Sequence, residues 1–245
     1  MYNMQENVTQ KTLEEEMADA NISASAISPS LVQGYKGFYN RYMKRMCDLF
    51  LSLILLIILS PVLLIISVLI ALESGFPVFY RAERGGLHGK SFRIFKFRSM
   101  VKNADRIGGG TTALNDSRIT KVGAFLRKTK LDEFANLISI VKGDMSFIGP
   151  RPELIRYTSQ YTGTEKLIEE VRPGITDFSS LEFINLDEIV GTENADEIFE
   201  QKVLPRKNKL RVKYAAKVSF ATDCYLFFRT VWKVVEKAMK FICKS

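Results

Sequence analysis

The longest apolar stretch of the chain covers residues 49–72 and is interrupted in its middle by Ser60-Pro61. About 20 apolar residues are enough for a helix to cross a bilayer core of roughly 30 Å. Proline has no N–H for the helical ladder, so a kink is expected there. Residues 49–60 alone reach about 18 Å at roughly 1.5 Å per residue, which is too short for a crossing. The pattern predicts a helix that enters the membrane, turns at Ser60-Pro61 and returns, with the Ser60 and Ser52 hydroxyls serving carbonyls that the proline frees.

Basic residues flank this stretch on both sides. Arg41, Lys44 and Arg45 precede it, and Arg81 and Arg84 follow it. An excess of Lys and Arg marks the cytoplasmic end of a membrane segment, so a re-entrant helix places both flanks on the favoured side. A kinked helix that spans the membrane and a helix buried in a protein core are the two alternatives.

Beyond residue 77 the spacing of the apolar positions changes. Residues 78–80 and 91–97 alternate around the glycine-rich turn at 85–89, which predicts a β-hairpin. Two amphipathic helices are expected next, because apolar residues recur at helical spacing in two sets: Ile119, Val122, Phe125 and Leu126, then Phe134, Leu137, Ile138 and Val141. A glycine, Gly143, is expected to end the second helix.

A further amphipathic helix is expected near the C-terminus. Its apolar positions are Tyr225, Phe228, Val231, Trp232, Val235 and Met239, with Arg229, Lys233, Lys237 and Lys240 between them. A basic helix with Trp and Phe suits a membrane interface, and packing against the protein core explains the spacing equally well. The predicted fold class is therefore α+β and membrane-associated, with a re-entrant N-terminal membrane helix, a mostly helical catalytic domain, a small β-hairpin and amphipathic interfacial helices.

Composition divides the chain into three parts. Residues 1–33 are polar and acidic and are expected to form a disordered tail, 34–76 an interfacial lead-in with the membrane helix, and 77–245 a cytoplasmic catalytic domain. Of the 245 residues, 47% are hydrophobic and 25% charged, which suffices for one core and the anchor. The net charge of the whole chain is +8; residues 1–33 carry −4, so the rest of the chain carries about +12 by difference. This charge favours a membrane surface or a phosphorylated ligand as partner, and without a recognisable binding motif no nucleic acid is expected.

Histidine and cysteine offer little chemistry. The single histidine, His88, stands in the glycine-rich turn, and Cys47, Cys224 and Cys243 are scattered without metal-ligand spacing. Acid–base, nucleophilic or metal chemistry is therefore expected on carboxylates, with Lys and Arg as electrostatic partners.

The adjacent carboxylates Asp132 and Glu133 are the strongest candidates for that chemistry. Prolines on both sides of Arg151 restrict the backbone and present its guanidinium with little freedom. The nearby cations are Arg127, Lys128, Lys130 and Arg151. Carboxylates among fixed cations suit phosphoryl transfer. The alternative is a helix start, in which both carboxylates face the positive end of the helix dipole and Asp132 is the N-cap.

Several short motifs follow one another in a fixed order. They are Lys44-Arg45 with Asp48, the Ser60-Pro61 break, residues 92–100 (FRIFKFRSM), 116–120 (DSRIT), 131–133 (LDE), 142–146 (KGDMS) with 149–152 (GPRP), and 172–176 (RPGIT). This set resembles the bacterial sugar transferase family, the monotopic phosphoglycosyl transferases that charge polyprenyl phosphate. The resemblance covers residues 41–177 and weakens afterwards, where Tyr214, Asp223 and Thr230 still fit the family pattern.

The resemblance implies a reaction and a location. Members of the family move the sugar-1-phosphate of a nucleoside-diphosphate sugar, usually a UDP-sugar, onto undecaprenyl phosphate, which starts a bacterial surface glycan or glycoconjugate. The catalytic domain is then expected on the cytoplasmic face of the bacterial inner membrane, in contact with its phospholipids. Ser60 and Pro61 match the break in the family's re-entrant helix. The oligomeric state stays open, with a homo-oligomer as one option.

The resemblance also implies roles for single residues. Asp132 matches the family's nucleophile, which attacks the β-phosphate, expels UMP and forms a phosphosugar–aspartyl intermediate that the lipid phosphate then attacks. Glu133 matches the ligand of Mg²⁺, the expected cofactor. Four basic residues match positions that bind phosphate or organise the site: Lys96, Arg98, Arg127 and Arg151.

Some positions depart from the family pattern. Many members read Pro-Gly-Ile-Thr-Gly-Trp-Ala-Gln where this chain has Asp177-Phe178-Ser179-Ser180 after the threonine. A frequent glutamine in the hairpin is Ala82, and the usual Pro-Gln after the acidic pair is replaced by residues 135–136 (AN). Because the chemical centre is intact, these departures predict a subgroup with a different sugar or nucleotide pocket.

Overall fold

The computed structural model describes residues 34–107, 112, 116–191 and 194–242, so the tail predicted for residues 1–33 lies outside the described residues. The longer helices are α2 (Lys44–Ser74), α4 (Lys121–Thr129), α5 (Asn136–Lys142), α10 (Leu204–Lys217) and α11 (Phe220–Ile242). The short helices are α3 (Ala104–Ile107), α6 (Ile155–Thr158), α7 (Phe178–Glu182), α8 (Leu186–Val190) and α9 (Ala195–Ile198). Segments of 3-10 or π type are η2 (Tyr39–Met43), η3 (Leu87–Gly89), η4 (Leu131–Glu133), η5 (Gly163–Glu170) and η6 (Phe199–Val203).

Six short strands pair in twos within the described residues. They are β1 (Phe79–Tyr80), β2 (Glu83–Gly85), β3 (Ser91–Arg93), β4 (Lys96–Phe97), β5 (Ser146–Ile148) and β6 (Gly174–Thr176). The pairs β1–β4 and β2–β3 are antiparallel and β5–β6 is parallel. The prediction of a mostly helical domain with few strands and one long apolar N-terminal helix is confirmed.

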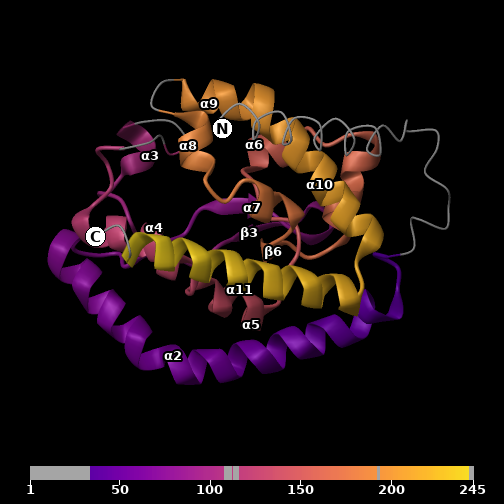
Figure 1. Ribbon diagram of the computed structural model, residues 1–245, viewed down its shortest axis with the longest axis horizontal. Helices are drawn as coiled ribbons and strands as arrows, with labels where there is room; N and C mark the ends of the chain where they lie inside the picture. The colour runs from indigo at the N-terminus through magenta and orange to yellow at the C-terminus, as the bar shows by residue number, and fades with distance from the viewer. Residues whose placement is uncertain (1–33, 108–111, 113–115, 192–193, 243–245) are drawn as a thin grey trace.

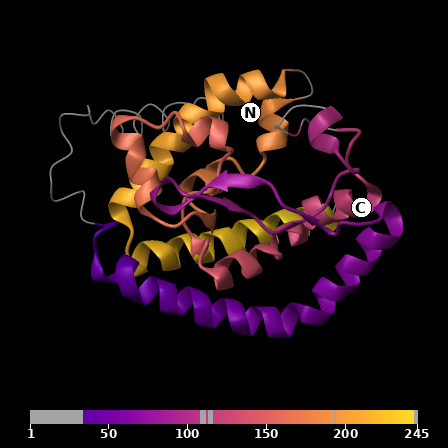
Figure 2. The ribbon, with the colours of Figure 1, turned by 180° about the vertical axis from the view of Figure 1, so that it is seen from behind.

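The long helix α2 continues through Pro61 and is bent near its middle, so that it wraps the underside of the molecule (Figures 1 and 2). Proline cannot donate to the carbonyl four residues earlier, which here belongs to Ile57. The Ser60 hydroxyl donates to that carbonyl at 2.8 Å, as predicted. The Ser52 hydroxyl donates instead to Leu49, at 3.0 Å, so the prediction that it serves a carbonyl freed by the proline is wrong.

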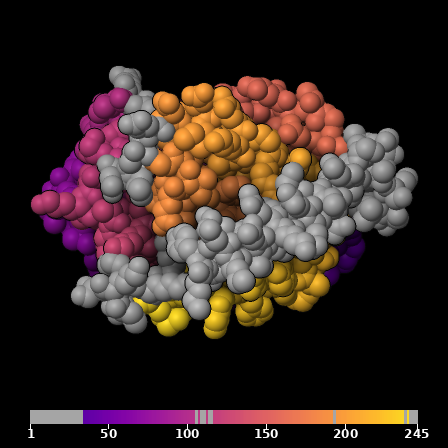
Figure 3. Space-filling view, turned by 45° about the horizontal axis from the view of Figure 1, so that its top comes forward, coloured from indigo at the N-terminus to yellow at the C-terminus, as the bar shows by residue number. Residues whose placement is uncertain are grey.

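Most of the apolar surface of α2 is not covered by protein. The helix Tyr39–Ser74 is long and apolar enough to cross a membrane, and 11% of its most apolar window is buried in the structure. Ile57 and Leu72 are 74% and 79% exposed, whereas Ile66 and Ile70 pack into the core. The core-helix alternative is therefore wrong, because such a helix would be covered on all sides. In the space-filling view, the indigo and purple atoms of this segment reach the visible face only at its edges (Figure 3).

Both ends of α2 are attached to the same folded body. At the N-terminal end, Lys44 forms a buried ion pair with Asp223 at the start of α11. At the C-terminal end, the Glu73 carboxylate accepts hydrogen bonds from the backbone N–H groups of Lys121 and Val122 in α4. The helix thus touches the domain along its length and at both termini.

The predicted β-hairpin is present, and it is divided into two short ladders. Phe79 pairs with Phe97 in the first ladder and Arg84 with Phe92 in the second. The glycine-rich turn that joins β2 to β3 contains His88 at φ 56, which confirms that this histidine is a turn residue. The chain departs from regular pairing at residues 94–95, where Ile94 packs against α5.

The two predicted amphipathic helices are α4 and α5. Leu126 of α4 and Leu137 and Ile140 of α5 are buried. Gly143 ends α5 at φ 91, a left-handed conformation that glycine adopts without steric cost, as predicted.

The C-terminal helix α11 has two apolar faces with different surroundings. Leu226 is fully buried in the core. Phe228 and Trp232 are 69% and 64% exposed. Core packing is therefore confirmed for one face of α11. A membrane-interface position of the other face stays a prediction, which its exposed apolar residues leave open.

Candidate active site

Asp132 lies in η4, between the helices α4 and α5, and its side chain is 2% exposed. Its Oδ2 atom lies 3.0 Å from the ammonium of Lys96, which strand β4 supplies. Its Oδ1 atom is buried and has no hydrogen-bond partner among the described residues. Asp132 caps no helix, since the N-cap of α5 is Ala135, so the N-cap alternative is wrong.

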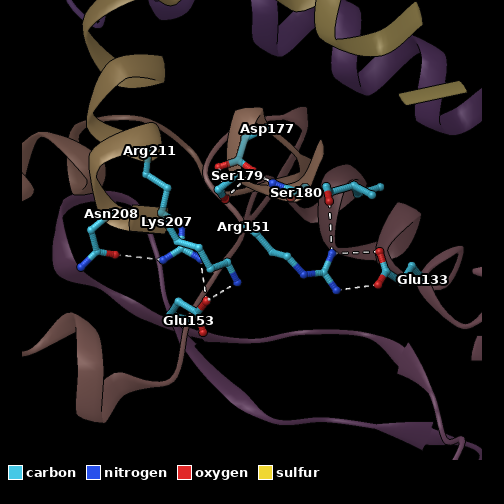
Figure 4. Close-up of polar contacts among 10 residues, drawn as sticks. Glu133, Arg151, Glu153, Asp177, Ser179, Ser180, Lys207, Asn208 and Arg211 are labelled. Atoms are coloured by element: carbon cyan, nitrogen blue, oxygen red, sulfur yellow. Dashed lines mark hydrogen bonds and ion pairs between the residues drawn. The ribbon is translucent and has the colours of Figure 1, made fainter. Parts of the chain in front are cut away.

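Glu133 is held by Arg151 through two parallel hydrogen bonds. The Arg151 Nη1 and Nη2 atoms donate to its carboxylate at 2.9 and 2.5 Å (Figure 4). The Lys96 ammonium lies 3.6 Å from the same carboxylate. Burial alone would raise the pKa of Glu133, but the charges of Arg151 and Lys96 outweigh it and hold the pKa well below its usual range. Glu133 is therefore a fixed anion.

The loop that carries Arg151 is positioned by close backbone contact between two motifs. Strand β5 leads into Gly149 and runs parallel to β6, which begins at Gly174. A Cβ on Gly149 would lie 2.3 Å from the Arg172 carbonyl oxygen, and one on Gly174 would lie 2.2 Å from the Gly149 nitrogen. Only glycine permits this approach, which also lets Arg151 Nη1 donate to the carbonyl of Ile175 at 3.2 Å.

A buried ionic cluster supports the same loop from the other side. The Glu153 carboxylate accepts from Lys207 at 3.1 Å and from Arg211 at 2.5 Å, both in α10 (Figure 4). Burial opposes ionisation of Glu153, but these two cations lower its pKa to about 2. No motif in the sequence predicted this cluster. Its signal is the spacing of Lys207 and Arg211, four residues apart on the helix face that also carries Leu210 and Tyr214.

Among the described residues, no hydrogen bond or ion pair joins the other two predicted phosphate-binding residues, Arg98 and Arg127, to the carboxylate pair. Arg98 is buried, and its Nη2 atom donates to Ser74 O at 2.9 Å and Gly75 O at 2.5 Å, at the end of α2. Burial lowers the pKa of Arg98. The pKa of Asp116 is lowered mainly by its hydrogen bond from Arg118, and the charge of Arg127 lowers it further. For Arg98 and Arg127, substrate binding stays a prediction.

Lys130, which the sequence indicated only as one of several cations near the carboxylates, contributes to the site. It adopts a left-handed conformation at φ 59 between α4 and η4. Burial lowers the pKa of Lys130. The charges of Arg151 and Lys96 lower it further, whereas the charge of Glu133 raises it. With Lys96 and Arg151 it makes the surroundings of the two carboxylates positive.

The departure at Asp177 has a structural explanation. The Asp177 carboxylate is fully buried and accepts from the Ser179 hydroxyl at 2.8 Å and from the Ser180 hydroxyl and backbone N–H at 2.7 Å (Figure 4). It is the N-cap of α7. Three of the four residues that replace the usual Gly-Trp-Ala-Gln are polar, and their side chains are hydrogen-bonded to one another next to the Arg151 loop (Figure 4).

Comparison with known proteins decides the family. Residues 39–237 match the model of the family described as bacterial sugar transferase. The chain belongs to the bacterial sugar transferase family. The match includes α2, the carboxylate pair and α11 as far as residue 237, so the site described above lies within the matched region.

Individual members of the family resemble the chain at about one third identity. The UDP-glucose:undecaprenyl-phosphate glucose-1-phosphate transferase of Escherichia coli (strain K12) is 35% identical over 201 residues, covering 79% of this chain and 40% of that protein. A sugar transferase of Bacillus subtilis (strain 168), EpsL, is 35% identical over 193 residues, covering 79% of this chain and 87% of that protein. The undecaprenyl-phosphate galactose phosphotransferase of Salmonella typhimurium is 36% identical over 152 residues, covering 56% and 32%. The chain therefore spans less than half the length of the E. coli and Salmonella relatives.

The two carboxylates could contribute ligands to a magnesium ion. Mg²⁺ takes oxygen ligands and is commonly bound by one or two carboxylates together with substrate phosphates and waters. Asp132 offers a buried oxygen without a hydrogen-bond partner among the described residues, and Glu133 stands next to it. Across the described part of the chain, no group of three or more His, Cys, Asp or Glu side chains is assembled. The remaining ligands would have to come from substrate and water.

Proposed function

We propose that this protein transfers the sugar-1-phosphate of a UDP-sugar to undecaprenyl phosphate, with Asp132 as nucleophile, at the start of a bacterial surface glycan. One observation carries the proposal. Asp132 has one oxygen oriented by Lys96 at 3.0 Å and a second, buried oxygen without a partner among the described residues. A carboxylate held in this way within positive surroundings has the orientation that attack on a diphosphate requires. The names of the relatives support both proposed substrates.

In the first step, the Asp132 oxygen forms a bond to the β-phosphorus of the UDP-sugar. The bond from that phosphorus to the bridging oxygen breaks, and UMP leaves with the bonding electron pair. Lys96, Lys130 and Arg151 stabilise the charge on the phosphate oxygens. Mg²⁺, when bound at Glu133, supplies further positive charge that offsets the repulsion between carboxylate and diphosphate.

In the second step, an oxygen of the lipid phosphate attacks the phosphosugar–aspartyl intermediate. The new phosphoanhydride forms, the bond to Asp132 breaks, and the carboxylate is regenerated. A covalent intermediate divides one displacement between two anions into two displacements at a single site. The same cations can serve both steps, since each transfers the same phosphorus.

We further propose that α2 is re-entrant and that the domain lies on the cytoplasmic face of the inner membrane. Contacts at both ends of α2 support this arrangement: Lys44 to Asp223 at one end and Glu73 to α4 at the other. A helix whose two ends contact one domain leaves that domain on one side of the bilayer. The bend around Pro61 and the hydrogen bond from Ser60 to Ile57 fit a helix that turns within the membrane.

The decisive experiment separates the first step from the second. The purified protein with Mg²⁺ is given a panel of UDP-sugars without lipid acceptor, and UMP is measured per protein molecule. One UDP-sugar should release about one equivalent of UMP per protein molecule and leave its sugar phosphate bound to the protein. When polyprenyl phosphate is added, UMP release should continue over many turnovers. Asp132→Asn should abolish release while the protein stays folded. The matched control Asp144→Asn, at a turn residue paired with Lys142 at 3.2 Å, should retain it. Unchanged turnover in Asp132→Asn would refute the nucleophile.

A further inference from the structure

A groove lies between the second half of α2 and the first strand of the hairpin. Its walls are formed by six residues, most of them apolar: Ser67, Phe76, Pro77, Val78, Phe79 and Arg81. Its volume is about 410 Å³, within the range of roughly 300–1,000 Å³ that is usual for ligand sites. None of these residues belongs to the carboxylate site or to the contacts that hold Arg151.

The mouth of the groove is apolar and adjoins the exposed side of α2. Phe76 at the mouth is 73% exposed, while Val78 and Phe79 in the wall are half-buried. Leu64 lies one helical turn before Ser67 and is 66% exposed. An apolar groove beside an apolar, uncovered helix suits a hydrocarbon chain that enters from the bilayer.

One end of the groove carries a positive charge. The guanidinium of Arg81 stacks on the Phe95 ring, 3.5 Å from its centroid. Among the described residues no carboxylate forms an ion pair with Arg81. The charge is therefore held in place by an aromatic ring and is free to meet an anion.

This charged end is connected to the carboxylate site through the hairpin. Phe95 directly precedes Lys96, whose ammonium contacts Asp132 at 3.0 Å. Across the ladder, Tyr80, the residue before Arg81, pairs with Lys96. A ligand with an apolar chain in the groove and an anionic head at Arg81 would thus lie next to the strand that orients Asp132.

We propose that this groove binds the isoprenoid chain of the polyprenyl phosphate acceptor, with Arg81 attracting its phosphate. The inference rests on the proposed function, because it assigns the acceptor of that reaction to a particular surface. The groove has an apolar wall, a cation without an ion pair among the described residues, and a connection to the strand of Lys96. These features suit the reacting lipid phosphate better than a phospholipid that only surrounds the protein.

The test uses two variants of the full chain in nanodiscs. Val78→Trp fills the groove, and Arg81→Gln removes its charge. Each should raise the KM for polyprenyl phosphate about tenfold, the effect of losing roughly 1.4 kcal/mol of binding. The KM for the UDP-sugar and the single-turnover release of UMP without acceptor should stay at wild-type values. Val68→Trp, on the uncovered face of α2, and Arg93→Gln, on an exposed strand position, are the matched controls.

A binding measurement decides the proposal independently of catalysis. A polyprenyl phosphate with a photoreactive group near its phosphate should cross-link within residues 67–81, and excess polyprenyl phosphate should compete while phospholipid should not. Wild-type acceptor KM values in both variants, or cross-links displaced by phospholipid, would overturn the proposal and assign the groove to bulk lipid. Absence of UMP release from the wild-type protein would instead contradict the proposed function, and the cross-link would still report on the groove.

Discussion

Asp132 and Glu133 are adjacent in the chain, yet the fold gives them different electrostatic environments. Arg151 donates to both oxygens of Glu133. Among the described residues, Asp132 forms its ion pair with Lys96 and keeps one oxygen without a hydrogen bond. Pairs of carboxylates with unequal surroundings commonly divide the chemical roles between them. Here the division favours Asp132 as the reacting group and Glu133 as the fixed charge beside it.

At the residue scale, Glu133→Ala should weaken the response to magnesium. The substitution removes one of the two adjacent carboxylates and leaves Arg151 without its partner, so both metal affinity and loop order should fall. The Mg²⁺ concentration for half-maximal UMP release should rise at least about tenfold. The thermal stabilisation that Mg²⁺ with UDP-sugar confers on the folded protein should shrink as well.

The control for this prediction is Asp144→Ala, which removes a carboxylate that pairs with Lys142 outside the site. It should leave the magnesium titration at its wild-type position. An unaltered titration in Glu133→Ala would count against Glu133 as a metal ligand.

Arg98, a residue of the 92–100 motif, has a structural role at the end of α2. Its side chain lies against the last turn of α2, where it donates to Ser74 and Gly75. A cation at a helix C-terminus satisfies free carbonyls and interacts favourably with the helix dipole. The basic residues of the 92–100 motif therefore serve two neighbouring purposes, Lys96 at the carboxylates and Arg98 at the end of the membrane helix.

At the element scale, the loop bearing Arg151 is fixed from two directions. The parallel pair β5–β6 holds its backbone, and the cluster of Glu153 with Lys207 and Arg211 attaches it to α10. Fixing a guanidinium in this way reduces the reorganisation needed when charge develops on a phosphate. The cluster also links the stability of α10 to the geometry of the site.

Glu153→Gln should destabilise the protein by roughly 3 kcal/mol at pH 7, since it removes the counter-charge of two buried cations. The pKa of Glu153 is lowered from 4.5 to about 2 in the folded state. Its stabilising contribution is therefore complete above about pH 4.5 and is lost as the pH falls towards 2. Unfolding in nanodiscs should show a gap between wild type and variant that is wide at pH 7 and narrows at pH 3.

Glu188→Gln, at an exposed position of α8, is the matched control and should follow the wild type at both pH values. A gap between wild type and Glu153→Gln that keeps the same size from pH 7 to pH 3 would show that the ionised carboxylate is not the stabilising group.

Local pattern predicted some elements and could not predict others, for a physical reason. The hairpin, α4 and α5 follow from periodicity and from turn residues within the segment itself, such as Gly143. The parallel pairing of β5 with β6 joins segments separated by a helix and η5, and no repeat spacing encodes it. The ion pair of Glu153 with Arg211 spans 58 positions and is equally invisible to local pattern.

The same contrast applies to the candidate site. Resemblance to the family singled out Asp132, Glu133, Lys96 and Arg151, and the fold brings these four together. It did not single out Lys130, whose place depends on a left-handed turn between two helices. Nor did it show that Asp177 caps α7, because that role follows from two serines folding back onto its carboxylate.

At the scale of the whole molecule, both α2 and α11 carry apolar residues that the described part of the protein leaves uncovered. The two helices start together at the Lys44–Asp223 ion pair, where the hydroxyls of Tyr39 and Tyr214 also contact Asp223 at 2.8 and 2.7 Å. From there they run in the same direction across the lower part of Figure 1. Lys44, Tyr214 and Asp223, which match the family pattern, thus attach α2 to the domain.

A re-entrant α2 should leave both of its flanks on the cytoplasmic side. Single cysteines introduced as Lys36→Cys and Lys90→Cys, in a chain whose native cysteines are replaced by serine, test this in intact cells. A thiol reagent that cannot cross the inner membrane should label neither position until the membrane is permeabilised. Labelling of one position alone in intact cells would mean that the helix spans the membrane.

The chain contains one tryptophan, which makes the position of α11 measurable without added probes. Trp232 is 64% exposed and belongs to the uncovered apolar stripe of α11. If that stripe lies at the membrane interface, Trp232 emission should shift to shorter wavelength in nanodiscs, and lipids brominated near the headgroup should quench it more than those brominated near the chain end. The control Trp232→Phe with Ile189→Trp moves the probe to exposed α8, across the molecule from α2 in Figure 1, and should lose both effects. Equal quenching at the two positions would separate α11 from the membrane surface and leave α2 as the sole contact within the described part of the chain.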